Sequence, residues 1–191
     1  MLGIGEHLIC LDKIPKICLI ITVGNKILTE VKVMGKKGKD IVGVDVEDLI
    51  KDLNKAYCDE WLAYYSWWYM SKVVTGPGYE DMSEFLEKIA KDEEEHASEV
   101  ANRIIELGGL PVANPMEIEK NANAPYPKPP KSTSDYKGII KTVTDAEAGA
   151  IDVYNKIAAK TLGKDHVTYQ LVCHILAEEV VHEEMFEDLA E

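Results

Sequence analysis

Two Glu-x-x-His segments, each set in a helical repeat of apolar residues, constrain this chain more than any other feature. Glu93 and His96 fall on a helix face whose apolar residues recur in steps of three and four. Glu179 and His182 do the same on a second face. These faces consist of Phe85, Ile89, Val100, Ile104 and Leu107, and of Val172, Ile175, Leu176, Phe186 and Leu189. Because buried charges are normally paired or bound to metal, two such segments predict a shared metal site.

Composition sets the broad class of the protein. With 191 residues, 46% of them apolar, the chain can form one domain with a substantial core. Its formal charge of -13 disfavours DNA binding and favours a surface that attracts cations. No apolar run reaches the roughly 18 residues of a membrane span, and no signal peptide is evident, so we expect a cytoplasmic protein without a membrane partner. Four cysteines without a C-x-x-C pair fit reduced, mostly buried thiols, namely Cys10, Cys18, Cys58 and Cys173.

The N-terminal region, residues 1–44, is expected to be an extension to a domain over residues 45–191. Two β-rich runs within residues 17–33 flank Gly24-Asn25, which predicts a β-hairpin. Alternatively, Met34 begins the functional domain and the residues before it are dispensable. The lysines that follow fit a solvated tail better than a DNA contact, given the net charge; they are Lys36, Lys37 and Lys39.

Four long helices are predicted, over residues 45–74, 82–107, 135–161 and 166–190. Ser134 is expected to cap the third and Asp165 the fourth. Between the second and third, residues 108–134 contain six prolines, which predicts a structureless connection that travels the length of a bundle. The prediction is an all-α four-helix bundle with a long crossover between helices two and three.

Each of the other two helices carries one carboxylate on its apolar face, Glu60 on the first and Glu147 on the third. Glu60 precedes Glu93 by nearly the same number of residues as Glu147 precedes Glu179, so the chain contains two copies of one helical hairpin. Together the copies supply six candidate metal ligands and catalytic residues, namely Glu60, Glu93, His96, Glu147, Glu179 and His182.

The six residues form a set that suits two iron ions, with manganese as an alternative. Residues at i and i+3 share a helix face, so each Glu-x-x-His can chelate from one side. Four carboxylates offset the charge of two cations, and glutamates from two helices can bridge them. The lack of thiolates on these faces disfavours zinc-finger and iron–sulfur chemistry.

Residues 45–189 resemble the ferritin-like superfamily, through Leu53-Asn-Lys-x4-Glu60, Glu147 and the two Glu-x-x-His segments. Two further stretches are similar to the bacterioferritin-related, Dps-like proteins of archaea and anaerobes: Arg103-Ile-Ile-Glu-Leu-Gly-Gly-Leu-Pro111 and Gly163-Lys-Asp-x3-Tyr169. The resemblance implies a ferroxidase that oxidises Fe(II) with dioxygen or peroxide and stores the product. It also implies a homo-oligomer, either a dimer or a 12-subunit shell.

Some positions depart from related families. Glu94 stands where bacterioferritins carry a haem-binding Met, so no haem is expected. Ala150 and the missing C-x-x-C disfavour a rubrerythrin. Gly149 and a cysteine-free crossover indicate that the thiol pair of many archaeal relatives is missing. The ligands with which typical Dps proteins build a site between subunits are also absent.

Several other residues are interpreted as structural. Trp67 and Tyr154 lie about two turns from Glu60 and Glu147 and could supply electrons, although core packing is the preferred interpretation. The side chains expected to turn away from the ligand faces are Cys58, Cys173, His166 and His174.

Two functional alternatives stay open. One is a peroxidase, catalase or oxidase of rubrerythrin-like type, with two iron or manganese ions, that stores nothing. The other is a DNA-protecting protein whose iron site is secondary. Subunit number separates storage from the first alternative, and salt-sensitive DNA binding would identify the second.

Overall fold

The computed structural model describes residues 20–23, 26–29 and 35–190. The chain divides into two compact units, Met1–Lys32 and Val33–Glu191, and each is described by itself. Among the described residues we find no helix with the length and apolarity needed to span a bilayer.

An antiparallel strand pair forms in the first unit. β1 (Ile20–Val23) pairs with β2 (Lys26–Thr29), and Val23 lies opposite Lys26. β-Branched and aliphatic residues dominate both runs, which favours extended backbone. The pairing matches the predicted hairpin, while the Gly24-Asn25 link lies outside the described residues.

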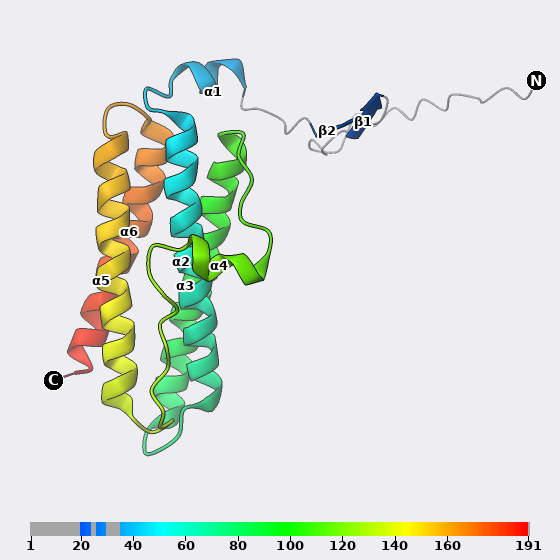
Figure 1. Ribbon diagram of the computed structural model, residues 1–191. Helices are drawn as coiled ribbons and strands as arrows, with labels where there is room; N and C mark the ends of the chain where they lie inside the picture. The colour runs from blue at the N-terminus through cyan, green and yellow to red at the C-terminus, as the bar shows by residue number, and fades with distance from the viewer. Residues whose placement is uncertain (1–19, 24–25, 30–34, 191) are drawn as a thin grey trace, which may run out of the picture. The chain divides into compact units, whose positions relative to one another are not determined.

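Four long helices run side by side in the second unit (Figure 1): α2 (Val46–Val73), α3 (Tyr79–Glu106), α5 (Tyr136–Thr161) and α6 (His166–Asp188). α2 packs along α3, and α5 packs along α6, so each pair is a helical hairpin. The predicted all-α four-helix bundle is therefore confirmed.

The predicted helix ends are close to those observed. α3 begins at Tyr79 instead of Met82, because Gly78 in the left-handed conformation (φ 75°) ends the turn just before it. Leu189, which was predicted to be buried, is 49% exposed because α6 has ended before it.

Aspartate side chains cap three of the long helices. Asp45 Oδ1 accepts a hydrogen bond from Asp48 N (2.8 Å) at α2, and Asp165 caps α6 as predicted. The predicted Ser134 cap of α5 is wrong: Asp135 Oδ1 accepts from Gly138 N (2.9 Å) instead. Ser134 lies one residue too early, and its hydroxyl contacts Ser132.

The segment before α2 packs on the end of the bundle. After the short helix α1 (Lys36–Asp40), Val42 and Val44 pack against the apolar cluster at that end. Gly43 N donates to Lys164 O (2.7 Å) in the turn between α5 and α6. The contacts of the bundle thus begin before residue 45.

The crossover between α3 and α5 contains two short helical segments, η1 (Pro115–Glu117) and α4 (Ile118–Asn121). The prediction of a structureless connection is wrong for these residues. Asn114 Oδ1 accepts from Met116 N (3.1 Å), and Pro115 occupies the first helical position, a combination that favours a helix start.

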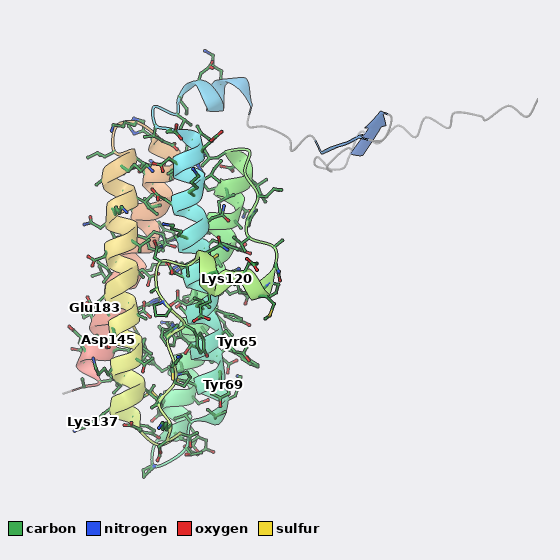
Figure 2. The ribbon with its side chains drawn as sticks, viewed as in Figure 1. Tyr65, Tyr69, Lys120, Lys137, Asp145 and Glu183 are labelled. Carbon is green, nitrogen blue, oxygen red and sulfur yellow. The ribbon has the colours of Figure 1, made fainter. Side chains whose placement is uncertain are left out.

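Polar side chains of α2 hold the crossover along the length of the bundle. Asn54 accepts from Val112 N (3.0 Å), and Asp59 accepts from Asn123 N (2.8 Å). Further along, Ser66 donates to Pro127 O (2.6 Å). The crossover therefore follows α2 in the direction of the chain. The side chain of Lys120 in α4, labelled in Figure 2, is exposed.

Two apolar clusters fill the bundle. One cluster includes Leu53, Ile104 and Ile175, and the other includes Leu86 and Phe186. On each of α2, α3, α5 and α6, the carboxylates and imidazoles identified from sequence lie between the residues of the two clusters. These buried carboxylates and imidazoles form a polar layer across the bundle, with apolar packing on both sides of it.

Candidate metal centre

The structure brings all six predicted site residues together in the polar layer. Each is at most 4% exposed: Glu60, Glu93, His96, Glu147, Glu179 and His182. Their ligand atoms form two groups, and within each group the atoms lie within 4.8 Å of one another. The first group is Glu60, Glu93, His96 and Glu179, and the second is Glu93, Glu147, Glu179 and His182.

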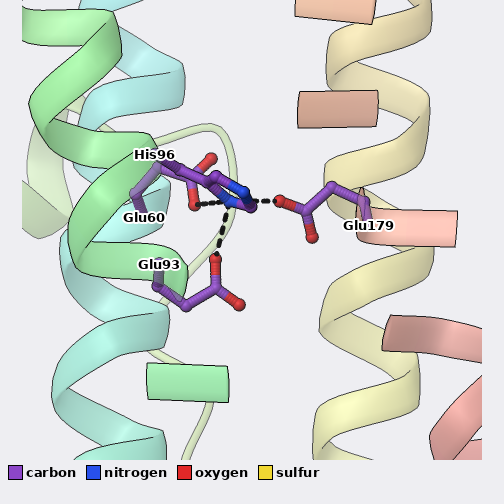
Figure 3. A group of neighbouring side chains, drawn as sticks. All are labelled: Glu60, Glu93, His96 and Glu179. Carbon is purple, nitrogen blue, oxygen red and sulfur yellow. Dashed lines mark ion pairs between the residues drawn. The ribbon is translucent and has the colours of Figure 1, made fainter. Parts of the chain in front are cut away.

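The first group surrounds the imidazole of His96, as Figure 3 shows. His96 Nδ1 lies 3.0 Å from Glu179 Oε1, 3.4 Å from Glu93 Oε2 and 3.7 Å from Glu60 Oε2. Glu93 and His96 come from α3, Glu60 from α2 and Glu179 from α6. Three helices therefore direct one nitrogen and three carboxylates at the same point.

The second group surrounds His182 of α6 in the same way. His182 Nδ1 lies 3.9 Å from a carboxylate oxygen of each of Glu93, Glu147 and Glu179. The imidazole planes of His96 and His182 are 27° apart, and the ring centroids are 6.0 Å apart. The two halves of the polar layer are therefore built alike.

Glu93 and Glu179 belong to both groups, which is the arrangement expected of carboxylates that bridge two ions. Several buried atoms here have no hydrogen-bond partner: the Nδ1 atoms of His96 and His182, both oxygens of Glu179 and Oε1 of Glu147. Buried polar atoms normally find partners, so unpartnered nitrogen and oxygen atoms that converge fit a pair of metal ions. Among the described residues, no cysteine belongs to either group.

Two carboxylates outside the six-residue set, which we call the outer carboxylates, contact the Nε2 atoms of the two histidines. Glu178 Oε2 of α6 lies 2.8 Å from His96 Nε2 of α3, and Asp92 Oδ2 of α3 lies 3.4 Å from His182 Nε2 of α6. Such contacts favour a proton on Nε2, which leaves Nδ1 free for a metal. The sequence interpretation missed both residues. Their position directly before Glu179 and Glu93 is a signal that could have indicated them.

Trp67 and Tyr154 contact the site as well as filling the core. Trp67 Nε1 donates a hydrogen bond to Glu93 Oε1 (3.2 Å), and the Tyr154 hydroxyl donates to Glu60 Oε1. Both side chains are at most 1% exposed. Core packing alone is therefore an incomplete description of them, because each orients one of the candidate ligands.

Burial and mutual repulsion favour protons on two of the carboxylates. Burial, with the charge of Glu179 next in importance, raises the pKa of Glu93 well above its ordinary value. Burial and the charge of Glu93 do the same to the pKa of Glu147. Without cations, the crowded carboxylates thus share protons to limit their repulsion.

The two histidines respond to the site in opposite ways. Burial alone would lower the pKa of His96, but the carboxylates of Glu179, Glu60 and Glu93 outweigh it and raise that pKa. Burial lowers the pKa of His182, whose carboxylate contacts are longer. His96 also helps to lower the pKa of Glu179 against the effect of burial, which favours opposite charges on these two side chains in the metal-free protein.

Cys58, Cys173 and His174 belong to neither group of candidate ligands. Cys58 is buried, and burial raises the pKa of its thiol to about 11, which makes it unreactive. Cys173 is half-buried and free, while Cys10 and Cys18 lie outside the described residues. His174 is exposed, and its Nε2 lies 3.9 Å from Glu178.

Comparison with known proteins agrees with this geometry. Residues 50–191 match the model of the ferritin-like domain family. The chain is 35% identical over 150 residues to the DNA protection during starvation protein of Pyrococcus furiosus, covering 77% of this chain and 79% of that protein. The family match includes all six candidate ligands.

Solved structures show the same fold. The bacterioferritin-related dodecameric thioferritin of Bacteroides fragilis is 37% identical, with a TM-score of 0.76 over 81% of this chain and 92% of that one. An archaeal Dps homologue from Halobacterium salinarum, 21% identical, has a TM-score of 0.71 over 76% of this chain and 81% of that one, and shows the fold alone. The chain is therefore a member of the ferritin-like family, with Dps and bacterioferritin-related proteins among its relatives.

Proposed function

We propose that this protein oxidises Fe(II) at the six-residue centre and stores the ferric product in a shell. One observation carries the proposal: two groups of four buried ligand atoms share Glu93 and Glu179. Such sharing would allow two ions to be held side by side, which suits a two-electron reaction. Oxygen and nitrogen ligands with an excess of carboxylates suit Fe(II) and the more highly charged Fe(III).

The proposed reaction balances with Fe(II) as the substrate. Two Fe(II) ions give up one electron each, and one hydrogen peroxide takes up these two electrons and two protons to form two water molecules. Dioxygen can accept two electrons in the same way and leave as hydrogen peroxide. Manganese could bind the same ligands, and iron is preferred because of the storage proteins among the relatives.

The residues of this chain would contribute binding, orientation and charge. Glu178 and Asp92 fix the two imidazoles, while Trp67 and Tyr154 orient Glu93 and Glu60. Protons held by Glu93 and Glu147 in the metal-free protein are released as cations bind, because a ligating carboxylate is ionised. The apolar clusters close the centre on both sides along the bundle.

Storage requires a hollow assembly, and the Bacteroides fragilis relative is described as dodecameric. We propose that this chain also assembles into a dodecamer. We propose that it acts in protection during starvation, the role stated in the name of the Pyrococcus furiosus relative. Native mass and iron content measured on one sample test this part. A dimer that retains no iron would refute storage while leaving the oxidation chemistry intact.

Substitutions test the centre itself. We expect Glu93→Ala or His182→Ala to abolish fast Fe(II) oxidation, measured as the appearance of ferric absorbance after addition of peroxide. The matched controls Glu94→Ala and Glu184→Ala remove exposed carboxylates on the same helices, and should keep the wild-type rate. Equal losses in both sets would mean that surface charge, and not this centre, drives oxidation.

A further inference from the structure

A cavity of about 510 Å³ lies beside the candidate metal centre, lined by α2, α5 and the crossover. Four of its lining residues are candidate ligands, namely Glu60, Glu93, Glu147 and Glu179, and all are buried. The lining also includes Asp145 of α5, labelled in Figure 2, whose side chain is exposed. The cavity therefore leads from the surface to the carboxylates of the centre.

The lining is apolar for most of its area, with residues such as Leu62, Ala63, Pro127 and Val153. Two of the acidic side chains in the lining are already engaged: Asp59 accepts hydrogen bonds from Asn123 and Ala124, and Asp145 pairs with Lys141. The exposed Lys128 and Asp152 add one charge of each sign to the lining. A passage for Fe(II) or hydrogen peroxide alone would need neither this volume nor these walls. Cavities of about 300–1,000 Å³ instead suit small organic ligands.

The inner end of the cavity offers polar chemistry. Glu147 is 2% exposed, and its Oε1 has no hydrogen-bond partner. Nearer the surface, the exposed Gly149 also lines the cavity, and a Cβ added to it would meet nothing within 4 Å, so the cavity is open at this turn of α5. The walls and inner end together fit a molecule with an apolar body and one small polar end.

We propose that this cavity binds small organic hydroperoxides, ROOH, with the organic group against the apolar walls and the hydroperoxide at the carboxylate end. The inference rests on the proposed function, because Fe(II) is the reductant. Two Fe(II) ions supply two electrons, the O–O bond breaks, and two protons are taken up. The alkoxide oxygen becomes ROH, the other oxygen leaves as water, and two Fe(III) ions remain.

The first test measures binding without any reaction. 2-Phenyl-2-propanol, the alcohol product of cumene hydroperoxide, is added to the metal-free full-length protein, and saturation-transfer NMR detects binding. The wild type should bind the alcohol, and Gly149→Leu, which places a side chain in the open space, should weaken binding by about tenfold or more. The matched control Ala148→Leu lies on the same helix outside the lining and should bind as the wild type does.

The second test compares cumene hydroperoxide with hydrogen peroxide as oxidants of Fe(II). In Gly149→Leu, the half-saturating concentration of cumene hydroperoxide should rise relative to that of hydrogen peroxide by about tenfold or more. Ala124→Leu, which fills the cavity from the crossover, should act in the same direction and guards against a folding defect in α5. Equal effects on the two oxidants would overturn the proposal, because the cavity would then be a general access route.

The two proposals can fail separately. If the wild type binds no alcohol, the cavity proposal is overturned even when hydrogen peroxide oxidises Fe(II) normally. If the wild type oxidises no Fe(II) with hydrogen peroxide or dioxygen, the proposed function fails, whatever the NMR experiment shows. Alcohol binding that Gly149→Leu and Ala124→Leu both leave unchanged also overturns the cavity proposal, since the alcohol would then bind elsewhere.

Discussion

Asp92 and Glu178 are counterparts: each directly precedes the glutamate of one Glu-x-x-His segment, and each contacts the histidine of the other. The two contacts cross the interface between α3 and α6 in opposite directions. A shift of one helix along the other would break both contacts at once. The pair therefore links the packing of the two hairpins to the orientation of the imidazoles.

Removal of an outer carboxylate should weaken metal binding. Glu178→Ala or Asp92→Ala leaves an imidazole without its Nε2 partner, and we expect metal affinity to fall about 10–100-fold. Glu178→Ala should have the larger effect, because its contact is 2.8 Å against 3.4 Å. Anaerobic calorimetry with Fe(II) or Mn(II) measures this, with Glu184→Ala and Glu94→Ala as controls. Unchanged affinity in both test variants would exclude an orienting role.

Metal should stabilise the bundle, and its removal should make stability depend on pH. The raised pKa values of Glu93 and Glu147 mean that the folded metal-free protein binds more protons than the unfolded chain above the ordinary pKa of 4.5. Its free energy of unfolding should therefore fall as pH rises from 4.5 through the raised values. Metal at a hundredfold excess over its dissociation constant should add about 2.7 kcal/mol.

The double variant Glu60→Gln, Glu147→Gln tests whether crowded carboxylates destabilise the metal-free bundle and whether metal stabilises it through them. The double variant should be more stable than wild type at neutral pH without metal, since glutamine is neutral at both positions and needs no proton uptake on folding, and metal should no longer stabilise it. Thermal melts with and without Mn(II) measure both effects. A wild-type midpoint that metal leaves unmoved would contradict a single site formed by the six residues.

Two tyrosine hydroxyls should differ in their effect on stability. Tyr154→Phe removes the donor to buried Glu60, which should lower the free energy of unfolding of the metal-free protein by about 1–3 kcal/mol. Tyr136→Phe removes a buried hydroxyl that has no partner, and should be neutral or stabilising. Urea denaturation compares them, and a loss of similar size in both would mean that the Tyr154 hydrogen bond contributes little.

A buried ion pair at the start of α6 should also affect stability. Arg103 is 5% exposed and contacts Asp165 Oδ2 at 2.9 Å, and Asp165 accepts from the Thr168 hydroxyl as well. Asp165→Asn should cost about 3 kcal/mol at neutral pH, because it removes the buried partner of Arg103 and leaves the exposed Glu106, 2.9 Å away, as the remaining partner of this charge. Asp135→Asn also replaces a helix cap but breaks no ion pair, so we expect it to cost little.

The pH dependence of this pair follows from the pKa of Asp165. Burial would raise that pKa, but Thr168 and Arg103 outweigh it and lower the pKa below its ordinary value of 3.8. The contribution is therefore present above pH 3.8 and is lost as pH falls through the lower folded pKa. Urea titrations should show the gap between wild type and Asp165→Asn narrowing only in that acidic range. A constant gap would point to helix capping instead of charge.

The six central residues could be predicted because each interrupts an apolar repeat of its own helix, a property of local sequence. Partners across helices could not be predicted in this way. Which α6 residue meets His96 depends on how α3 and α6 lie against each other, so Glu178 was missed. The course of the crossover along the bundle was predicted, but its contacts with α2 were not, because they join residues far apart in the chain, such as Asp59 and Asn123. Its short helices were missed although Asn114 before Pro115 is a local signal for a helix start. At Asp135, two adjacent capping residues competed, and sequence alone did not rank them.

The presence of Glu93 and Glu179 in both groups has a consequence for the synthesis and folding of the chain. The first group takes three ligands from the N-terminal hairpin and one from the C-terminal hairpin, and the second group reverses this ratio. Neither hairpin alone offers a complete set of four. A nascent chain that has only α2 and α3 outside the ribosome, or one cut within the crossover and separated, therefore lacks a full set of ligands for iron. The proposed oxidation therefore requires that both hairpins have been synthesised and have docked.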